Sequence, residues 1–154
     1  SIEAMARRVA KGQELPSINA LVDIGNVLSL RHLVPTGGHS LDDVTEDIAL
    51  RAASGEEVFV PFGETEEEHP FPGEFIFAEG NKVLTRRWSW RQANHTLTLP
   101  ETKSIEFNVD GLPPVERSEV EAVCGELEEL VERFCGGTFR REILCASQPR
   151  MSLS

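Results

Sequence analysis

Apolar residues recur with a helical period at both ends of the chain and with a period of two in between. Ile2, Met5 and Val9 share one face, which predicts a helix that starts at the first residue and stops at Gly12. A helix beginning at the first residue suggests that further chain precedes it. A second helix is predicted over residues 17–33, between two prolines.

The middle of the chain alternates between apolar and polar positions. This alternation predicts five short strands, at residues 48–52, 58–62, 75–77, 83–85 and 105–109. We expect the first two to form one hairpin and the next two to form another, because glycine-containing turns separate them. Short strands joined in this way are typical of a mixed, mainly antiparallel sheet.

The last predicted helix has the clearest signals. Ser118 and Glu121 have the spacing of a capping box, an apolar stripe continues to Phe134, and glycines follow it. Its outward face is predicted to be a solvated surface rather than a metal site; it carries Glu119, Glu126, Glu128, Glu129 and Glu132.

Residues 138–144 are expected to return as a strand and residues 147–154 to form a tail. The prediction is therefore an α+β fold: a single domain over residues 1–146, with layered mixed and antiparallel sheets and flanking helices at both ends.

The formal net charge of −11 excludes a protein that coats nucleic acid or anionic lipid through charge. No apolar run reaches the ~20 residues of a membrane helix, so no membrane partner is expected. The three cysteines have no paired spacing, which indicates reduced thiols in a cytoplasmic protein. No nucleotide loop occurs and the histidines lie far apart, so neither a cofactor nor a metal is expected.

His39 ends a turn predicted over residues 34–39, which contains Gly37 and Gly38. An imidazole titrates near neutral pH, so it suits the positioning of water or a substrate hydroxyl. The alternative is an exposed loop histidine without a role.

Both tryptophans and three arginines fall within residues 86–92. On a strand, Trp88 and Trp90 would share one face, where they could stack a base while guanidinium groups hold a phosphate. The alternative is that the indoles belong to the core and the arginines pair with acidic neighbours. Residues 82–103 hold five basic side chains and one acidic side chain, a formal charge of +4, which leaves −15 elsewhere. Asp23 and Asn26, three residues apart on one helix face, could likewise serve a site or only bond local backbone.

The segments at residues 17–26, 34–38, 86–92 and 101–103 resemble those of free-standing B3/B4-domain proteins. These proteins are similar to the B3/B4 editing domain of the phenylalanyl-tRNA synthetase β subunit, which hydrolyses tyrosine wrongly attached to tRNA. The resemblance covers roughly residues 1–144 and implies an α+β fold with layered sheets. Gln92 falls in the segment that carries the synthetase's substrate-recognising glutamate, and it can hydrogen-bond a polar substrate group.

The residues and the resemblance together give candidate site residues in three roles. The catalytic candidates are His39 and Gln92; the substrate-binding candidates are Asn26, Gly37, Gly38, Trp88, Trp90 and Asn94; the RNA-binding candidates are Arg86, Arg87, Arg91 and Lys103.

The expected activity is hydrolysis of misacylated aminoacyl-tRNA in trans by a positioned water, without a covalent nucleophile. The expected partner is the tRNA 3′ acceptor end or aminoacyl-tRNA, and not a long duplex, because few phosphates need neutralising at the tip of a tRNA. Two alternatives stay open: a non-catalytic module that binds tRNA or an aminoacyl ligand, and an interaction domain whose acidic helix docks a basic partner. The sequence does not set the oligomeric state.

Overall fold

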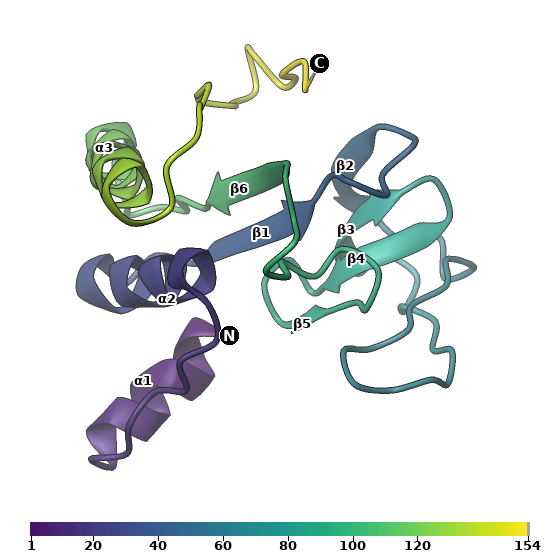
Figure 1. Cartoon of the computed structure of the whole chain (residues 1–154). Helices are drawn as coiled ribbons and strands as arrows, with labels where there is room; N and C mark the ends of the chain where they lie inside the picture. Colours follow the sequence, from purple (N-terminus) through teal and green to yellow (C-terminus); the bar gives the residue numbers. More distant parts are fainter. Residues whose placement is uncertain (154) are drawn as a thin grey trace. The chain divides into compact units, whose positions relative to one another are not determined.

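A computed structural model describes residues 1–153 and confirms the predicted mixed α+β class (Figure 1). The elements are, in order, α1 (Ile2–Ala10), α2 (Ala20–His32), β1 (Thr36–Ser40), β2 (Ile48–Ala52), β3 (Phe75–Glu79), β4 (Lys82–Arg86), β5 (Arg91–Gln92), β6 (Ile105–Val109) and α3 (Arg117–Phe134). Among the described residues, no helix is long and apolar enough to cross a membrane.

The chain divides into two compact units. The first consists chiefly of Gly37–Phe107, and the second combines Ile2–Thr36 with the residues from 108 onward. The second unit is therefore built from both ends of the chain, with the first unit inserted between them. The domain extent expected from the sequence, residues 1–146, stays a prediction.

In the first unit, β2, β3, β4 and β5 form one antiparallel sheet in that order, and β1 pairs with β6. Phe77 pairs with Thr85, but a register shift makes Ala78 pair with Val83. Neighbouring residues of β3 point to opposite faces, whereas cross-strand partners share a face. Thr85 and Val83 therefore lie on opposite faces of the sheet, although plain alternation would place them together.

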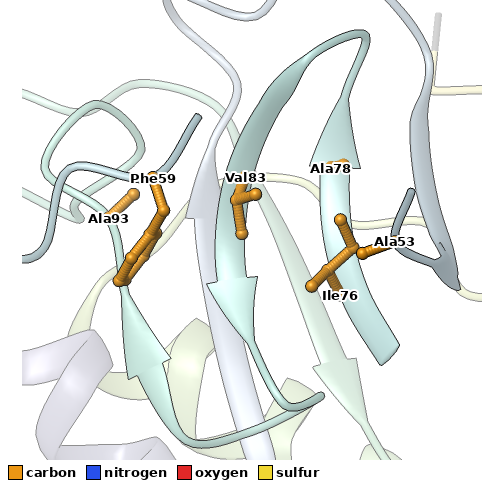
Figure 2. Close-up of a cluster of buried hydrophobic side chains, with 6 residues drawn as sticks. All are labelled: Ala53, Phe59, Ile76, Ala78, Val83 and Ala93. Atoms are coloured by element: carbon orange, nitrogen blue, oxygen red, sulfur yellow. The ribbon is translucent and has the colours of Figure 1, made fainter. Parts of the chain in front are cut away.

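The core of the first unit lies on the Val83 face. Figure 2 shows its buried side chains, contributed by the sheet and by the segments beside it: Ala53, Phe59, Ile76, Ala78, Val83 and Ala93. Phe59 and Ile76 are fully buried, and full burial of such side chains contributes about 1.5–3 kcal/mol each.

In the second unit, α2 and α3 pack around a core of Ile24, Leu28, Val34 and Val123. Helix α2 begins after Asn19, whose side chain accepts from Val22 N at 3.0 Å. Glu126 of α3 accepts from Arg31 and, at 2.6 Å, from His32 Nε2, so it joins α3 to α2. The prediction that Glu126 belongs to a solvated acidic face is therefore wrong.

Two strand predictions are wrong. Strand β2 pairs with β3 rather than with residues 58–62, which make only isolated bridges. The turn after β2 is instead closed by the buried Glu57 carboxylate, which accepts from Ser54 N and Gly55 N at 3.1 and 3.0 Å. Within residues 58–62, Pro61 cannot donate a backbone hydrogen bond to a neighbouring strand, because it has no N–H.

The predictions for residues 34–39 and 138–144 are also wrong. Residues 36–40 form strand β1 rather than a turn, and residues 138–144 form no strand. Helix α3 is capped two residues earlier than predicted, at Glu116 rather than Ser118: Glu119 accepts from Glu116 N at 2.7 Å, while Glu121 pairs with Arg117. Residues 145–148 close a small bridged turn across the start of the predicted tail, whose last residue, 154, lies outside the described residues.

Candidate functional site

His39 lies at the centre of a hydrogen-bonded chain of side chains from three strands of the first unit. Its Nδ1 is 2.7 Å from Glu106 Oε2 of β6, and its Nε2 is 2.8 Å from Thr85 Oγ1 of β4. The ring packs on Phe77 with centroids 5.1 Å apart, and the residue is only 2% exposed. The expectation of an exposed loop histidine is therefore wrong.

The chemistry of the two partners indicates the direction of these hydrogen bonds. An ionised Glu106 carboxylate can only accept, so Nδ1 carries the proton that it donates. In a neutral imidazole the other nitrogen then accepts, and the Thr85 hydroxyl is its donor. The arrangement is a carboxylate–imidazole–hydroxyl chain.

Gln92 lies beside this chain. It is the cross-strand partner of Thr85, and its Nε2 donates to Gly38 O at 2.9 Å and to Thr96 O at 3.1 Å. The amide therefore ties β5 to β1 next to His39. The structure thus brings together His39 and Gln92, which the sequence proposed as a catalytic pair, and Gly38.

Gly37 and Gly38 are strand residues rather than turn residues. A Cβ at Gly38 would lie 3.4 Å from the Phe107 ring, at the limit of ordinary van der Waals contact.

Arg86 and Arg91 lie on the other face of the sheet. They are paired across β4 and β5, each one position along from Thr85 and Gln92, so their side chains point away from His39. Both arginines are held by glutamates: Arg86 by Glu74 and Glu68, and Arg91 by Glu68 and Glu64.

Arg86 forms the centre of this second cluster. It is 5% exposed, and it donates to Glu74 at 2.9 and 2.7 Å and to Glu68 at 2.9 Å. The Arg86 hydrogen bonds lower the pKa of Glu74, against the effect of burial. The alternative that the arginines pair with acidic neighbours therefore describes Arg86 and Arg91.

The tryptophans do not lie on a strand. Residues 87–90 form a turn in which Arg87 and Trp88 have positive φ angles of 47° and 64°, so the prediction of one shared indole face is wrong. Trp90 is 42% exposed, with the guanidinium groups of Arg87 and Arg91 at 4.5 and 5.1 Å from its ring centroid. Trp88 is half-buried against Phe75.

Asn94 and Lys103 take no part in the hydrogen bonds of the His39 chain. Asn94 holds the neighbouring loop, accepting from Gly63 N at 3.0 Å and donating to Glu64 O at 2.7 Å. It also lines an open pocket of about 760 Å³, whose described lining includes Val83 but not His39, Thr85 or Gln92. Lys103 is exposed.

Asn26 belongs to α2 of the second unit. Its neighbour Asp23 accepts from Ser17 Oγ at 2.6 Å and from Ile18 N at 2.9 Å, which is the local backbone-capping role that the sequence left open.

Sequence reasoning missed Thr85 and Glu106. Thr85 lies two residues after Val83, so the sequence pattern makes it an ordinary strand position on the same face. Only the register shift turns its side chain toward His39. Glu106 stands between Ile105 and Phe107 in a strand pattern, where a charged residue normally indicates the solvent face. The signal that could have identified Glu106 was a single acidic residue within a short, mostly apolar strand.

The fold and the site define a class of protein: a small α+β chain with a carboxylate–imidazole–hydroxyl chain held between strands. Within residues 1–153, no group of three or more His, Cys, Asp or Glu side chains could hold a metal ion. The chain belongs to the B3/4 domain family, whose model matches residues 1–136; this is the domain of the phenylalanyl-tRNA synthetase β subunit. The chain has no match among curated proteins.

Proposed function

We propose that this protein binds the aminoacylated 3′ end of tRNA in the cytoplasm and hydrolyses the ester of misacylated tRNA in trans. One observation carries the proposal: Gln92 donates to Gly38 O on β1, next to His39, and its cross-strand partner Thr85 places a hydroxyl 2.8 Å from His39 Nε2. Membership of the B3/4 family supports a tRNA-related substrate.

In this proposal the two faces of the first unit have different roles. The His39 face holds the ester, and Gln92 keeps β1 in place, because its Nε2 is bonded to two backbone carbonyls. Contact with terminal phosphates falls to Arg87 and Lys103, which are exposed. Arg86 and Arg91 are already neutralised by glutamates.

The test is deacylation of tRNAs charged with several wrong amino acids. The wild-type protein should release at least one amino acid, and Gln92→Ala and Glu106→Gln should slow release at least ~10-fold. His69→Ala is the matched control, because His69 lies in a loop and is not part of the carboxylate–imidazole–hydroxyl chain. This variant should keep the wild-type rate. Failure of the wild-type protein to deacylate any of these tRNAs would contradict the hydrolytic function.

Phosphate contact can be measured separately. If Arg87 and Lys103 are the phosphate contacts, log K against log salt should have a slope near roughly −1.4, because each contact with a single strand contributes about −0.7. A slope near roughly −2.8 would instead indicate that Arg86 and Arg91 also engage phosphates.

A non-catalytic module is the second candidate: both His39 ring nitrogens have side-chain partners, so neither is left to hold a hydrolytic water directly. It predicts saturable binding of a non-hydrolysable 3′-amide aminoacyl-tRNA without turnover of the ester. Measuring binding and deacylation on the same preparation distinguishes the two candidates.

The acidic face of α3 offers less support for docking a basic partner. Besides Glu126, Glu119 accepts from Glu116 N, Glu121 pairs with Arg117, and Glu128 pairs with Arg141. These carboxylates already have partners within the chain.

A further inference from the structure

The Thr85 hydroxyl occupies the position that a nucleophile takes in a hydrolytic triad. Its Oγ1 is 2.8 Å from His39 Nε2, and the opposite ring nitrogen is 2.7 Å from the Glu106 carboxylate. Both distances are within the range in which a base takes a proton and a carboxylate orients the base. The residues come from β4, β1 and β6, so no local sequence motif contains them.

Burial favours transfer of a proton from the Thr85 hydroxyl to His39. His39 is 2% exposed, the Glu106 side chain is 20% exposed, and Thr85 is partly exposed. The imidazole is therefore shielded from bulk water, and the group that it can deprotonate is the Thr85 hydroxyl rather than a free water. Thr85, at the end of the chain opposite Glu106, is partly exposed.

The register shift between Phe77 and Ala78 is what presents Thr85 to His39. Without it, Thr85 would share the face of Val83, which is part of the buried core. A hydroxyl is thus turned out of the core and against an imidazole, and β-bulges of this kind commonly re-aim a side chain at an active site.

We propose that Thr85 is the nucleophile of the ester hydrolysis, with His39 as its general base and Glu106 as the positioning residue. This inference rests on the proposed function and replaces the positioned water, expected from the sequence, with a covalent step. Thr85 Oγ1 attacks the ester carbonyl carbon and gives its proton to His39 Nε2. The bond to the ribose oxygen then breaks, and His39 returns the proton to that oxygen, which leaves a free tRNA 3′ end and an acyl-threonine.

Water completes the cycle. It attacks the acyl-threonine carbonyl and gives a proton to His39, the bond to Thr85 Oγ1 breaks, and His39 returns the proton to Thr85. The product is the free amino acid, and no oxidant, reductant or further reactant is required.

The experiment uses p-nitrophenyl acetate, an activated ester that needs no tRNA, alongside the misacylated tRNAs. Intact-mass measurement and peptide mapping should locate an acetyl group on Thr85 of the wild-type protein. Thr85→Val should abolish this adduct, Thr85→Ser should keep it, and Glu106→Gln should slow its formation at least ~100-fold. Thr65→Val, the same substitution on an exposed loop, is the matched control and should acylate like the wild-type protein.

Folding is checked by thermal melting of each variant, and Thr85→Ser keeps the test valid if Thr85→Val fails to fold. Absence of an acyl adduct at Thr85 overturns the inference, as does a Thr85→Val protein that hydrolyses within ~3-fold of the wild-type rate. If tRNA deacylation proceeds in such a protein, the proposed function survives and only the nucleophile is wrong. If Thr85 is acylated but no tRNA is deacylated, the nucleophile stands and the tRNA substrate is wrong.

Discussion

Arg86→Met should destabilise the first unit more than removal of an exposed charge would. Arg86 is 5% exposed, and its main partner, the Glu74 side chain, is 6% exposed. Methionine approximates the length of the aliphatic part of arginine but leaves the Glu74 carboxylate buried without a counter-ion.

The size of the effect follows from how deeply each partner is buried. Removal of one partner from a buried pair costs about 3–5 kcal/mol, and this applies to Glu74. The Glu68 side chain is 34% exposed, so its pair adds no more than ~1 kcal/mol. We therefore expect a loss of about 3–5 kcal/mol in the free energy of unfolding near neutral pH.

The effect should shrink in acid. Because the Arg86 hydrogen bonds lower the pKa of Glu74, the pair contributes its full stability above the usual carboxylate pKa of 4.5 and loses that contribution as pH falls below it. In Arg86→Met the Glu74 carboxyl protonates more readily, so the difference from wild type narrows at low pH.

Urea unfolding followed by far-UV circular dichroism measures both effects. Arg87→Met is the matched control, since Arg87 is exposed and its side chain forms no ion pair within the described residues; it should cost less than ~0.5 kcal/mol. Arg86→Met combined with Glu74→Leu should recover most of the loss. A loss below ~1 kcal/mol in the single variant, or no recovery in the double variant, would refute the reasoning.

Three further predictions concern stability. Burial raises the pKa of Glu79, but hydrogen bonds, the strongest from Thr45 N, outweigh it and lower the pKa to about 2; acid titration of unfolding should show stability lost between pH 4.5 and about 2, and Glu79→Gln should flatten that loss. Thr96→Val should raise the free energy of unfolding by about 1 kcal/mol, because the fully buried Thr96 hydroxyl has no partner within the described residues; a lower urea midpoint would contradict this. Asn19→Ala should cost about 1 kcal/mol through loss of the α2 cap to Val22, with Asn19→Asp retaining stability in thermal melts.

Periodicity predicted where helices and strands lie along the chain, because that depends on each element's own residues. Helices α2 and α3 and strands β2 and β6 lie close to their predicted positions. Pairing was less accessible, since alternation identifies a strand but not its partner. Residues 58–62 alternate as a strand does, yet make only isolated bridges, and β2 pairs with β3.

Candidate site residues came from the type of side chain or from the resemblance. His39 could be selected because an imidazole suits the positioning of water, and Gln92 because its segment resembles the one that carries the synthetase's glutamate, whereas Thr85 depends on a register shift that the sequence does not mark. The turn at Arg87 and Trp88 was missed because both residues adopt positive φ without a glycine to signal it.

The charge pattern shows why proximity along the chain misled. Residues 82–103 have a formal charge of +4, which seemed suited to a polyanion. In space, Glu64, Glu68 and Glu74 from the preceding segment pair with Arg86 and Arg91. These pairs lie on the face opposite His39. Their charges cancel locally, so this face is a packed surface rather than a binding surface for phosphates. Under the proposed function, a nucleic acid at the His39 face is held mainly by its aminoacyl end and by few phosphates, so the nature of the ester, rather than the length of the RNA, is the main determinant of binding.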